Sequence, residues 1–512
     1  MENNRRVIEI FKNITIVVLL VLTILLLYFF WNDIKLEDIS LRSLLDQSRS
    51  EGYELIEVDS VLIPENMEIC LDETTYSRAD ELTEELWQGS DRVQSLKDAV
   101  ITVLSTSDTI LEEITEEEYY EAMEFLSVRA VFDINLPFGG YCDYMGLRRP
   151  INSDNLLEIN EIGFSMGAVD SLFIYDGSQG RYFRIASEYD ASELLTSQQS
   201  LIAESSNLTY YPLDQFIGAE TAAWTMVPTY LETGLTEQTA GKEFTNGDTA
   251  YISEMARNIF SGSFDFVRKI EEESGRTIYM YGYSEELLTF DDGLVTYRAE
   301  AGGNTSAGTS GSTMGYFEAL ETALADVSVQ GGFRDRNGNS YDVRLSGSYE
   351  VENGYGFRFQ MMLDGAAVFY SDGYMLDCQV ADGMLTYMDR EFLDVQGGKT
   401  PDASGSESDA SGQLREAYSP ANVLAQNYGY IYGQLTESGV EDGSAPTSLQ
   451  FDIAAGHITD MDYGYCYLRG NSQGSAGSLI PCYRVELDSG DICYINLYTA
   501  EIIQGEESYG LE

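Results

Sequence analysis

An uncharged stretch near the N-terminus constrains this chain more than any other feature. Residues 14–31 read ITIVVLLVLTILLLYFFW and contain no charged residue, glycine or proline. An α-helix of this length rises about 27 Å, which is close to the hydrocarbon thickness of a bilayer. We therefore predict a transmembrane helix at 14–31 that follows a cytoplasmic tail at 1–13.

The residues that flank this stretch predict its orientation. Arg5, Arg6 and Lys12 precede it. Because positive charge favours the cytoplasmic side, we expect a single-pass protein of the cell membrane, with a cytoplasmic N-terminus and most of the chain extracytoplasmic. A cleaved signal peptide is the alternative. We favour a signal anchor, since the bulky Tyr28 and Trp31 stand where small residues would guide cleavage, and their rings suit the headgroup level.

The predicted membrane helix has few polar side chains. Between Ile14 and Tyr28 the only hydroxyls belong to Thr15 and Thr23. Because these are eight residues apart, they lie within about 80° of one helix face. That face could form hydrogen bonds to another membrane helix, each contributing on the order of 0.6 kcal/mol. Alternatively, the hydroxyls bond to carbonyls of their own helix, and the segment is a passive anchor.

The charge of the chain excludes one class of partner. It contains 86 acidic and 29 basic residues, for a formal net charge of -57. Such a chain repels nucleic acid phosphates, so we expect no nucleic acid partner. His457 is the only histidine, and the six cysteines lack the spacing of a zinc site. We therefore predict no metal and no cofactor, and the redox state of the cysteines stays open.

Periodicity after the anchor predicts an α+β protein of helices packed with antiparallel sheets. A juxtamembrane stalk helix is expected first, and then a membrane-proximal domain. Two small polar stretches indicate flexible linkers. The two units that they bound, each a helix followed by strands, are similar to one another. The predicted order is stalk 32–57, proximal domain 58–300, linker 301–315, middle domain 316–395, linker 396–412 and C-terminal domain 413–512.

Local signals predict individual elements. Thr115 and Glu118 form a capping box at a helix start. Ser419 followed by Pro420 predicts another helix N-terminus. By contrast, the composition of residues 99–105 (AVITVLS) and of 448–468 indicates strands.

The C-terminal sequence predicts a hairpin with a defined register. A two-residue turn at Ser489 and Gly490 would place Val485 opposite Tyr494 on the apolar face. Cys482 and Cys493 would then lie on the other face, too far apart to bridge. Cys466 on the preceding strand could still reach one of them.

One motif points to a hydrolase. Residues 163–167 read GFSMG and match the G-x-S-x-G elbow, with Ser165 as nucleophile and His457 downstream. That elbow needs a helix after the serine, whereas residues 168–177 continue as a strand. We therefore favour a glycine-rich turn. The second functional hypothesis is nevertheless a membrane-anchored extracellular hydrolase that acts on envelope polymers.

A second motif resembles the start of a calcium loop. Asp335, Asn337 and Asn339 have the alternating spacing of an EF-hand, but Ser340 and Ser346 replace its glycine and its bidentate glutamate. We favour a hairpin turn at Asn337 and Gly338.

An acidic cluster could supply paired carboxylates for glycoside hydrolysis. Most of it lies at the predicted helix start, where the helix dipole favours anions, so solvated capping is the favoured use. The cluster comprises Glu112, Glu113, Glu116, Glu117, Glu118 and Glu121.

Several longer segments resemble the YycH and YycI family of Gram-positive membrane regulators. They are the basic N-terminus with its anchor, FDFVRKIEEESGRTIYMYGYSEELLTFDDGLVTY at 264–297, LDGAAVFY at 363–370 and IPCYRVELDSGDICYINLYTAEII at 480–503. Their order is most similar to YycH.

The resemblance implies a non-enzymatic protein with extracytoplasmic α+β domains, the later ones PepSY-like. It implies action on a WalK-type sensor histidine kinase of cell-wall homeostasis, beside a YycI-like sister protein. The family has no small site motif, so no catalytic, cofactor or metal residue is carried over.

Overall fold

The computed structural model describes residues 55–503 apart from short gaps. Within this part of the chain, no helix has both the length and the apolar character needed to cross a bilayer. Ile14, Thr15, Thr23, Tyr28 and Trp31 lie outside the described residues, as do most of the predicted stalk and linkers. The gaps are 73–74, 79–81, 107–108, 205–208, 283–284, 300–313, 337, 396–413, 442 and 471–473.

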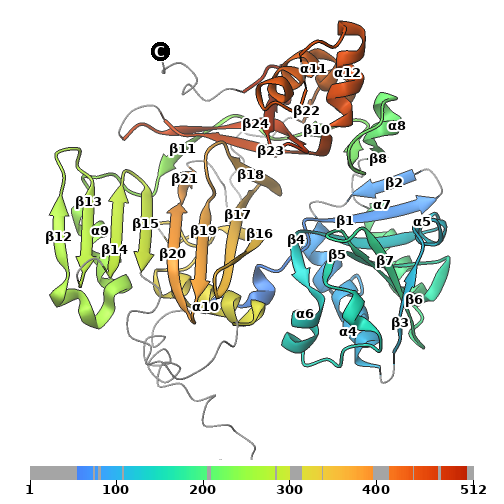
Figure 1. Cartoon of the computed structure of the whole chain (residues 1–512), viewed down its shortest axis with the longest axis horizontal. Coiled ribbons are helices and arrows are strands. Elements are labelled where there is room, and N and C mark those ends of the chain that lie inside the picture. The colour runs from blue at the N-terminus through green and yellow to red at the C-terminus, as the bar shows by residue number, and fades with distance from the viewer. Residues whose placement is uncertain are drawn as a thin grey trace, which may run out of the picture. The chain divides into compact units, whose positions relative to one another are not determined.

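The first half of the described chain forms a nine-stranded sheet with helices packed on it (Figure 1). All its strand pairs are antiparallel. In order across the sheet, the strands are β3 (Leu111–Ile114), β7 (Arg181–Ala186), β6 (Ala168–Asp176), β5 (Glu158–Ser165), β4 (Ser127–Pro137), β1 (Asn66–Asp72), β2 (Thr75–Arg78), β8 (Thr209–Pro212) and β9 (Met226–Pro228).

One helix of this half corrects a prediction. Residues 99–105 belong to helix α4, not to a strand. The Ser95 hydroxyl accepts a hydrogen bond from the backbone N–H of Asp98 and caps the helix. Leu96, Val100 and Val103 are fully buried at helical spacing, so tertiary packing overrides the strand preference of the β-branched residues.

The helices of this half are η1 (Val58–Ser60), α3 (Thr83–Gln88), α4 (Leu96–Ser105), α5 (Glu116–Met123), α6 (Phe138–Tyr144), η3 (Ser153–Asn155), α7 (Ser192–Glu204) and α8 (Leu213–Ile217).

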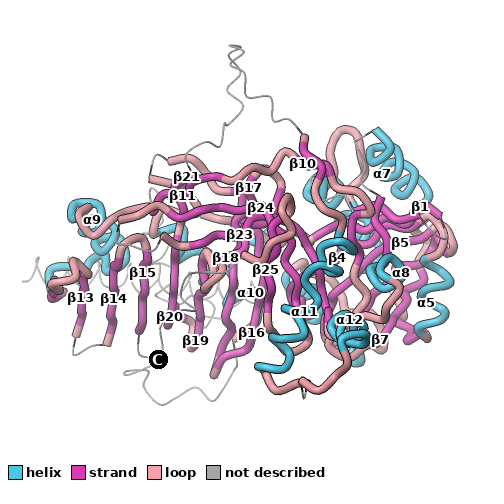
Figure 2. Tube along the Cα trace, turned by 90° about the horizontal axis from the view of Figure 1, so that it is seen from above, coloured by secondary structure: helices cyan, strands magenta, loops and turns pink. Residues whose placement is uncertain are grey.

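The second half builds a fourteen-stranded sheet, whose strands β13, β14, β15, β20 and β19 run side by side in Figure 2. Its main path is β12 (Arg268–Glu271), β13 (Thr277–Tyr281), β14 (Glu286–Asp291), β15 (Leu294–Ala299), β20 (Met384–Glu391), β19 (Leu376–Ala381), β17 (Gly354–Leu363), β18 (Ala366–Tyr370), β23 (Ile458–Leu468), β24 (Gly477–Leu487), β11 (Gln238–Lys242) and β21 (Leu393–Val395). In addition, β16 (Asp342–Val351) pairs with β17, and β25 (Ile492–Asn496) pairs with β24.

This sheet runs across the predicted domain boundaries. β15, before the first predicted linker, pairs with β20 after it. β18 of the predicted middle domain pairs with β23 of the C-terminal one, and this pair is parallel. The described chain is thus α+β with mainly antiparallel sheets, as predicted. The division into separable domains stays a prediction.

The helices of the second half confirm two predicted starts and correct one segment. α10 starts at Tyr316, and Ser419 caps α11 by accepting from the N–H of Asn422. Residues 448–456, predicted as strand, lie in helix α12, which packs against α11. The remaining elements are α9 (Thr249–Phe260), η4 (Ser261–Phe266), α10 (Tyr316–Val329), α11 (Pro420–Glu437), α12 (Thr447–Gly456) and the short pair β10 (Glu232–Thr233) with β22 (Arg415–Glu416).

The C-terminal hairpin forms, but its predicted register was wrong by one residue. Val485 pairs with Cys493 rather than with Tyr494. The turn has three residues, and Gly490 takes a φ of 86°, which shifts every later pair. Cys482 and Cys493 therefore lie on opposite faces of the sheet, in different hydrophobic clusters. All six cysteines are buried free thiols.

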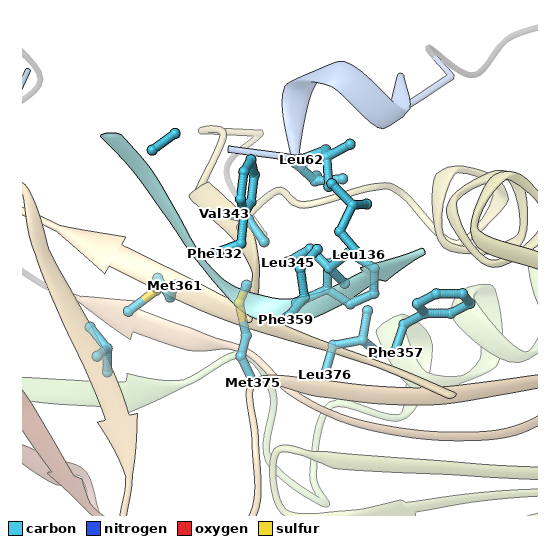
Figure 3. Close-up of a cluster of buried hydrophobic side chains, with 14 of the residues drawn as sticks. Leu62, Phe132, Leu136, Val343, Leu345, Phe357, Phe359, Met361, Met375 and Leu376 are labelled. Atoms are coloured by element: carbon cyan, nitrogen blue, oxygen red, sulfur yellow. The ribbon is translucent and has the colours of Figure 1, made fainter. Parts of the chain in front are cut away.

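Side chains from both sheets meet in what we call the apolar seam, shown in Figure 3. Phe132 and Leu136 of β4 pack with Val343 and Leu345 of β16, and Leu62 lies beside them. The N–H of Leu345 donates to the carbonyl of Val61 at 2.8 Å. Buried apolar contact thus joins the two sheets into one body.

Candidate functional site

The nine-stranded half carries an open hollow of about 480 Å³, which we call the aromatic hollow. Its walls include Tyr76 of β2, Tyr120 and Met123 of α5, and Trp224 of the loop before β9. The Trp224 ring centroid lies 6.3 Å from that of Tyr76 and 6.2 Å from that of Tyr120. The Trp224 side chain is 42% exposed, so an aromatic surface faces solvent here.

Helix α5 positions one wall of the hollow. Its capping box is confirmed: the Thr115 hydroxyl accepts from the N–H of Glu118, and the Glu118 carboxylate accepts from the N–H of Thr115. Tyr119 and Met123 are buried against Phe173 of β6, which fixes the rotation of the helix. Tyr120, the next residue along, is left half-buried beside Trp224.

Arg129 of β4 forms part of the lining, and its charge is already neutralised. Its guanidinium donates to Glu68 at 2.5 Å and to Glu161 at 2.8 Å. Burial alone would lower the pKa of Arg129, but these two carboxylates raise it well above its usual value. The Tyr119 hydroxyl also donates to Glu161, at 3.1 Å. The positive charge of Arg129 is therefore already balanced by two carboxylates, and it is not free to bind an anion in the hollow.

Three carboxylates line the hollow as well, from Glu116, Glu124 and Asp214. Among the described residues, no lysine or arginine forms an ion pair with any of them. The described part of the chain also has no group of three acidic, histidine or cysteine side chains that could hold a metal ion. These three carboxylates therefore border the hollow without a lysine or arginine partner from the part of the chain that the structure describes.

The loop that carries Trp224 forms hydrogen bonds to strand β23 of the second sheet. The N–H of Ala222 donates to the carbonyl of Ile458 at 2.9 Å. The Thr225 hydroxyl donates to the Asp460 carboxylate at 3.1 Å and accepts from the N–H of Met461 at 3.4 Å. A ligand that moves Trp224 would therefore act directly on β23.

Beside this loop, charged side chains of the two sheets meet in what we call the charged seam. Arg78 of β2 pairs with Asp462 of β23 at 3.0 Å, and both side chains are buried. Arg344 of β16 donates to the carbonyl of Glu65 at 2.9 Å. The charged seam consists of these four residues, Arg78, Asp462, Arg344 and Glu65, together with Asp460 of β23.

Two carboxyl groups of the charged seam, those of Glu65 and Asp460, have raised pKa values. Burial, with the nearby charge of Asp133, raises the pKa of Glu65 well above its usual value. Burial and the charges of Glu65 and Asp462 raise the pKa of Asp460 to about 7. The seam therefore changes its charge near neutral pH.

The predicted nucleophile and histidine are not brought together. Ser165 ends strand β5 and leads into a turn before β6, as expected for a hairpin. Its buried hydroxyl donates to the carbonyl of Ala122 at 2.5 Å and accepts from the N–H of Gly167 at 3.1 Å. His457 instead contacts Asp488 at 2.8 Å and Glu441 at 3.4 Å. Burial lowers the pKa of His457, but these two carboxylates raise it more, so the net shift is upward.

The other two motifs are also engaged in local structure. The Asp335 carboxylate accepts from the backbone N–H and the side-chain amide of Asn339, which closes a turn. Asn337 lies outside the described residues. In the acidic cluster, Glu112 pairs with Arg184 and Glu113 with Arg181, while Glu118 serves the capping box.

Sequence reasoning missed Tyr76, Tyr120, Trp224 and Asp460. One signal for Trp224 exists: it directly follows the small and polar residues ETAA at 220–223, which offer a large aromatic no apolar neighbour. Neither periodicity nor composition predicts that two distant segments, β2 and α5, meet the loop that carries it.

Comparison with known proteins supports a likeness of fold. No family model matches the sequence, and no curated protein matches it. The structure is similar to the crystal structure of YycH from Bacillus subtilis, with a TM-score of 0.52, 11% sequence identity, and coverage of 86% of this chain and 98% of that one. It also matches, at a TM-score of 0.32 and 12% identity, an uncharacterized protein from Eubacterium rectale, over 56% of this chain and 91% of that one. The described chain therefore has a YycH-like fold.

Proposed function

We propose that this protein is a membrane-anchored, non-enzymatic regulator whose extracytoplasmic part binds and modulates a sensor histidine kinase. The kinase would be of the WalK type and control cell-wall homeostasis. A YycI-like sister protein would be a further partner, and the later strands would form PepSY-like units. The observation that carries this proposal is the YycH-like fold over most of the chain.

Two further features support it. The predicted helix at 14–31 would anchor the chain in the membrane that holds such a kinase. The hydrolase alternative draws no support from the described geometry, since Ser165 is buried and bonded to backbone groups and His457 has other partners.

In vivo crosslinking followed by affinity capture from membranes tests the proposal. We expect the full chain to capture a sensor histidine kinase, and deletion of the gene to change the output of that kinase. Capture without any kinase would contradict the proposal. So would turnover of envelope polymer by the purified protein that disappears in Ser165→Ala or in Glu112→Gln/Glu113→Gln.

A helix exchange tests whether the membrane segment takes part. We expect that replacing 14–31 with an unrelated spanning helix, at matched membrane abundance, weakens kinase capture but does not abolish it, because two threonine hydrogen bonds contribute little. Unchanged capture and unchanged kinase output would reduce this segment to a tether.

A further inference from the structure

We propose that the aromatic hollow binds a lysine or arginine side chain carried on a basic segment of the protein partner. This inference rests on the proposed function and names the chemistry by which the partner is recognised. Its elements are the rings of Tyr76, Tyr120 and Trp224 and the carboxylates around them.

The rings favour a cationic group. A lysine ammonium or an arginine guanidinium is attracted to the face of an aromatic ring, and most strongly to that of tryptophan. Trp224 is exposed, and its ring is close to those of both Tyr76 and Tyr120. The faces of these rings also give the aliphatic stem of either side chain an apolar surface to pack against.

Three charged groups around the rings are negative, which also favours a cationic ligand. Glu116, Glu124 and Asp214 border the hollow, and in the described chain no lysine or arginine pairs with them. The lining cation, Arg129, is held by Glu68 and Glu161, so it does not balance the other carboxylates. An incoming cation would therefore meet unpaired negative charge.

The surroundings favour a side chain on a peptide over a small free cation. Phe125, 54% exposed, follows Glu124 directly in the sequence. Met166, 42% exposed, lies near it, because its N–H donates to the carbonyl of Leu126. A free cation would leave these apolar groups in water, whereas a peptide that inserts a basic side chain could cover them with its neighbouring residues.

The hollow is large enough for a basic side chain. About 480 Å³ lies within the range of small-ligand sites and leaves room for a lysine or arginine together with neighbouring atoms of its segment. The hollow is therefore suited to binding a basic residue of a partner segment, while Phe125 and Met166 would contact the residues on either side of it.

Calorimetric titration of the full chain in detergent tests the inference with three probes. They are a capped peptide Gly-Leu-Lys-Leu-Gly, the same peptide with norleucine in place of lysine, and tetramethylammonium chloride. We expect the lysine peptide to bind, the norleucine peptide to bind at least tenfold more weakly, and tetramethylammonium to bind more weakly than the lysine peptide. Binding should weaken as salt is added, since the attraction is partly between exposed charges.

Variants locate the binding. We expect Trp224→Ala to weaken binding of the lysine peptide at least tenfold, and Glu116→Gln/Glu124→Gln to weaken it several-fold. The matched control is Phe266→Ala, which removes an aromatic ring that is 79% exposed in the other half of the molecule and should leave binding unchanged. Thermal unfolding of each variant shows whether it is folded.

Several outcomes would overturn the inference. They are equal affinity for the norleucine peptide, tighter binding of tetramethylammonium than of the lysine peptide, no binding of the lysine peptide, or full binding by a folded Trp224→Ala chain. Kinase capture separates this inference from the proposed function. If the wild-type chain captures the kinase but binds no lysine peptide, only the inference fails. If it binds the peptide but captures no kinase, the proposed function fails.

Discussion

The two sheets meet through two seams of opposite character. In the apolar seam, Phe132 and Leu345 are almost fully buried among other hydrophobic side chains, and their contact does not depend on protonation. In the charged seam, Arg78 and Asp462 are buried as an ion pair beside Asp460, whose pKa is about 7. Apolar burial stabilises the joint, while a buried ion pair must first offset the loss of hydration. We therefore expect the apolar seam to supply most of the stability of the joint, and the charged seam to give it a dependence on pH.

The largest effect is expected in the apolar seam. Phe132→Ala removes a ring that is 5% exposed and packs edge-on against Trp87, with centroids 5.5 Å apart. We expect the free energy of unfolding to fall by about 3–5 kcal/mol, as for other buried aromatic deletions. Urea unfolding measures it. Phe266→Ala is the control and should stay within about 0.5 kcal/mol of the wild type. A loss below about 1 kcal/mol for Phe132→Ala would contradict the primary role of this seam.

A somewhat smaller effect is expected when the charged seam loses one partner. Arg78→Met leaves the buried Asp462 without its ion pair, and we expect a loss of about 3 kcal/mol. The double variant Arg78→Met/Asp462→Leu should recover most of that loss, because no buried charge remains unpaired. Arg149→Met is the matched control, since Arg149 and Asp143 form an exposed pair that contributes below about 1 kcal/mol. A double variant as unstable as the single one would show that the pair itself holds the joint.

A third, smaller effect concerns pH. Because the pKa of Asp460 is raised in the folded state, that state binds more protons than the unfolded chain between about pH 4 and pH 7. The stability contributed by protonation of Asp460 is therefore fully present at low pH and is lost as the pH rises toward 7. The Asp460 side chain is 37% exposed, so solvent screens part of this effect. We expect Asp460→Asn to flatten the decline in stability over this interval, as measured by urea unfolding at several pH values. An unchanged pH profile would count against a titrating charged seam.

The smallest effect on the assembled structure is expected from cutting the chain. Proteases should cut first within 301–315 and 396–412, which are small and polar stretches. We expect the fragments to stay together in gel filtration, because β15 pairs with β20 and β18 with β23 across those stretches. Fragments that separate under native conditions would show independent domains, and resistant fragments that span both stretches would contradict the predicted linkers.

Local signals account for what the sequence predicts correctly. The capping box at Thr115 and the cap at Ser419 are confirmed because each depends on residues within one helical turn. Helix α4 was mistaken for a strand because its β-branched residues favour strands locally, whereas its buried face is set by packing. The hairpin register depended on whether the turn has two residues or three, and adding Asp488 to the turn changed the face of every residue after it.

The candidate site could not be predicted by the same reasoning. Trp224 meets Tyr76 and Tyr120 only because β2, α5 and the loop before β9 converge in the folded chain. The raised pKa of Asp460 likewise depends on Glu65 and Asp462, and Glu65 approaches only when the two sheets join. Long-range pairing decides both features, and single-sequence patterns report only local preference.

Site-specific photocrosslinking in the native membrane tests most directly whether the aromatic hollow contacts a sensor histidine kinase. We would place p-benzoylphenylalanine at Ala223, an exposed residue lining the aromatic hollow, and separately at Glu273, an exposed turn residue of the other half. We expect position 223 to crosslink to a sensor histidine kinase and position 273 to give no kinase adduct above background. No kinase adduct at position 223, or equal adducts at both positions, would contradict it.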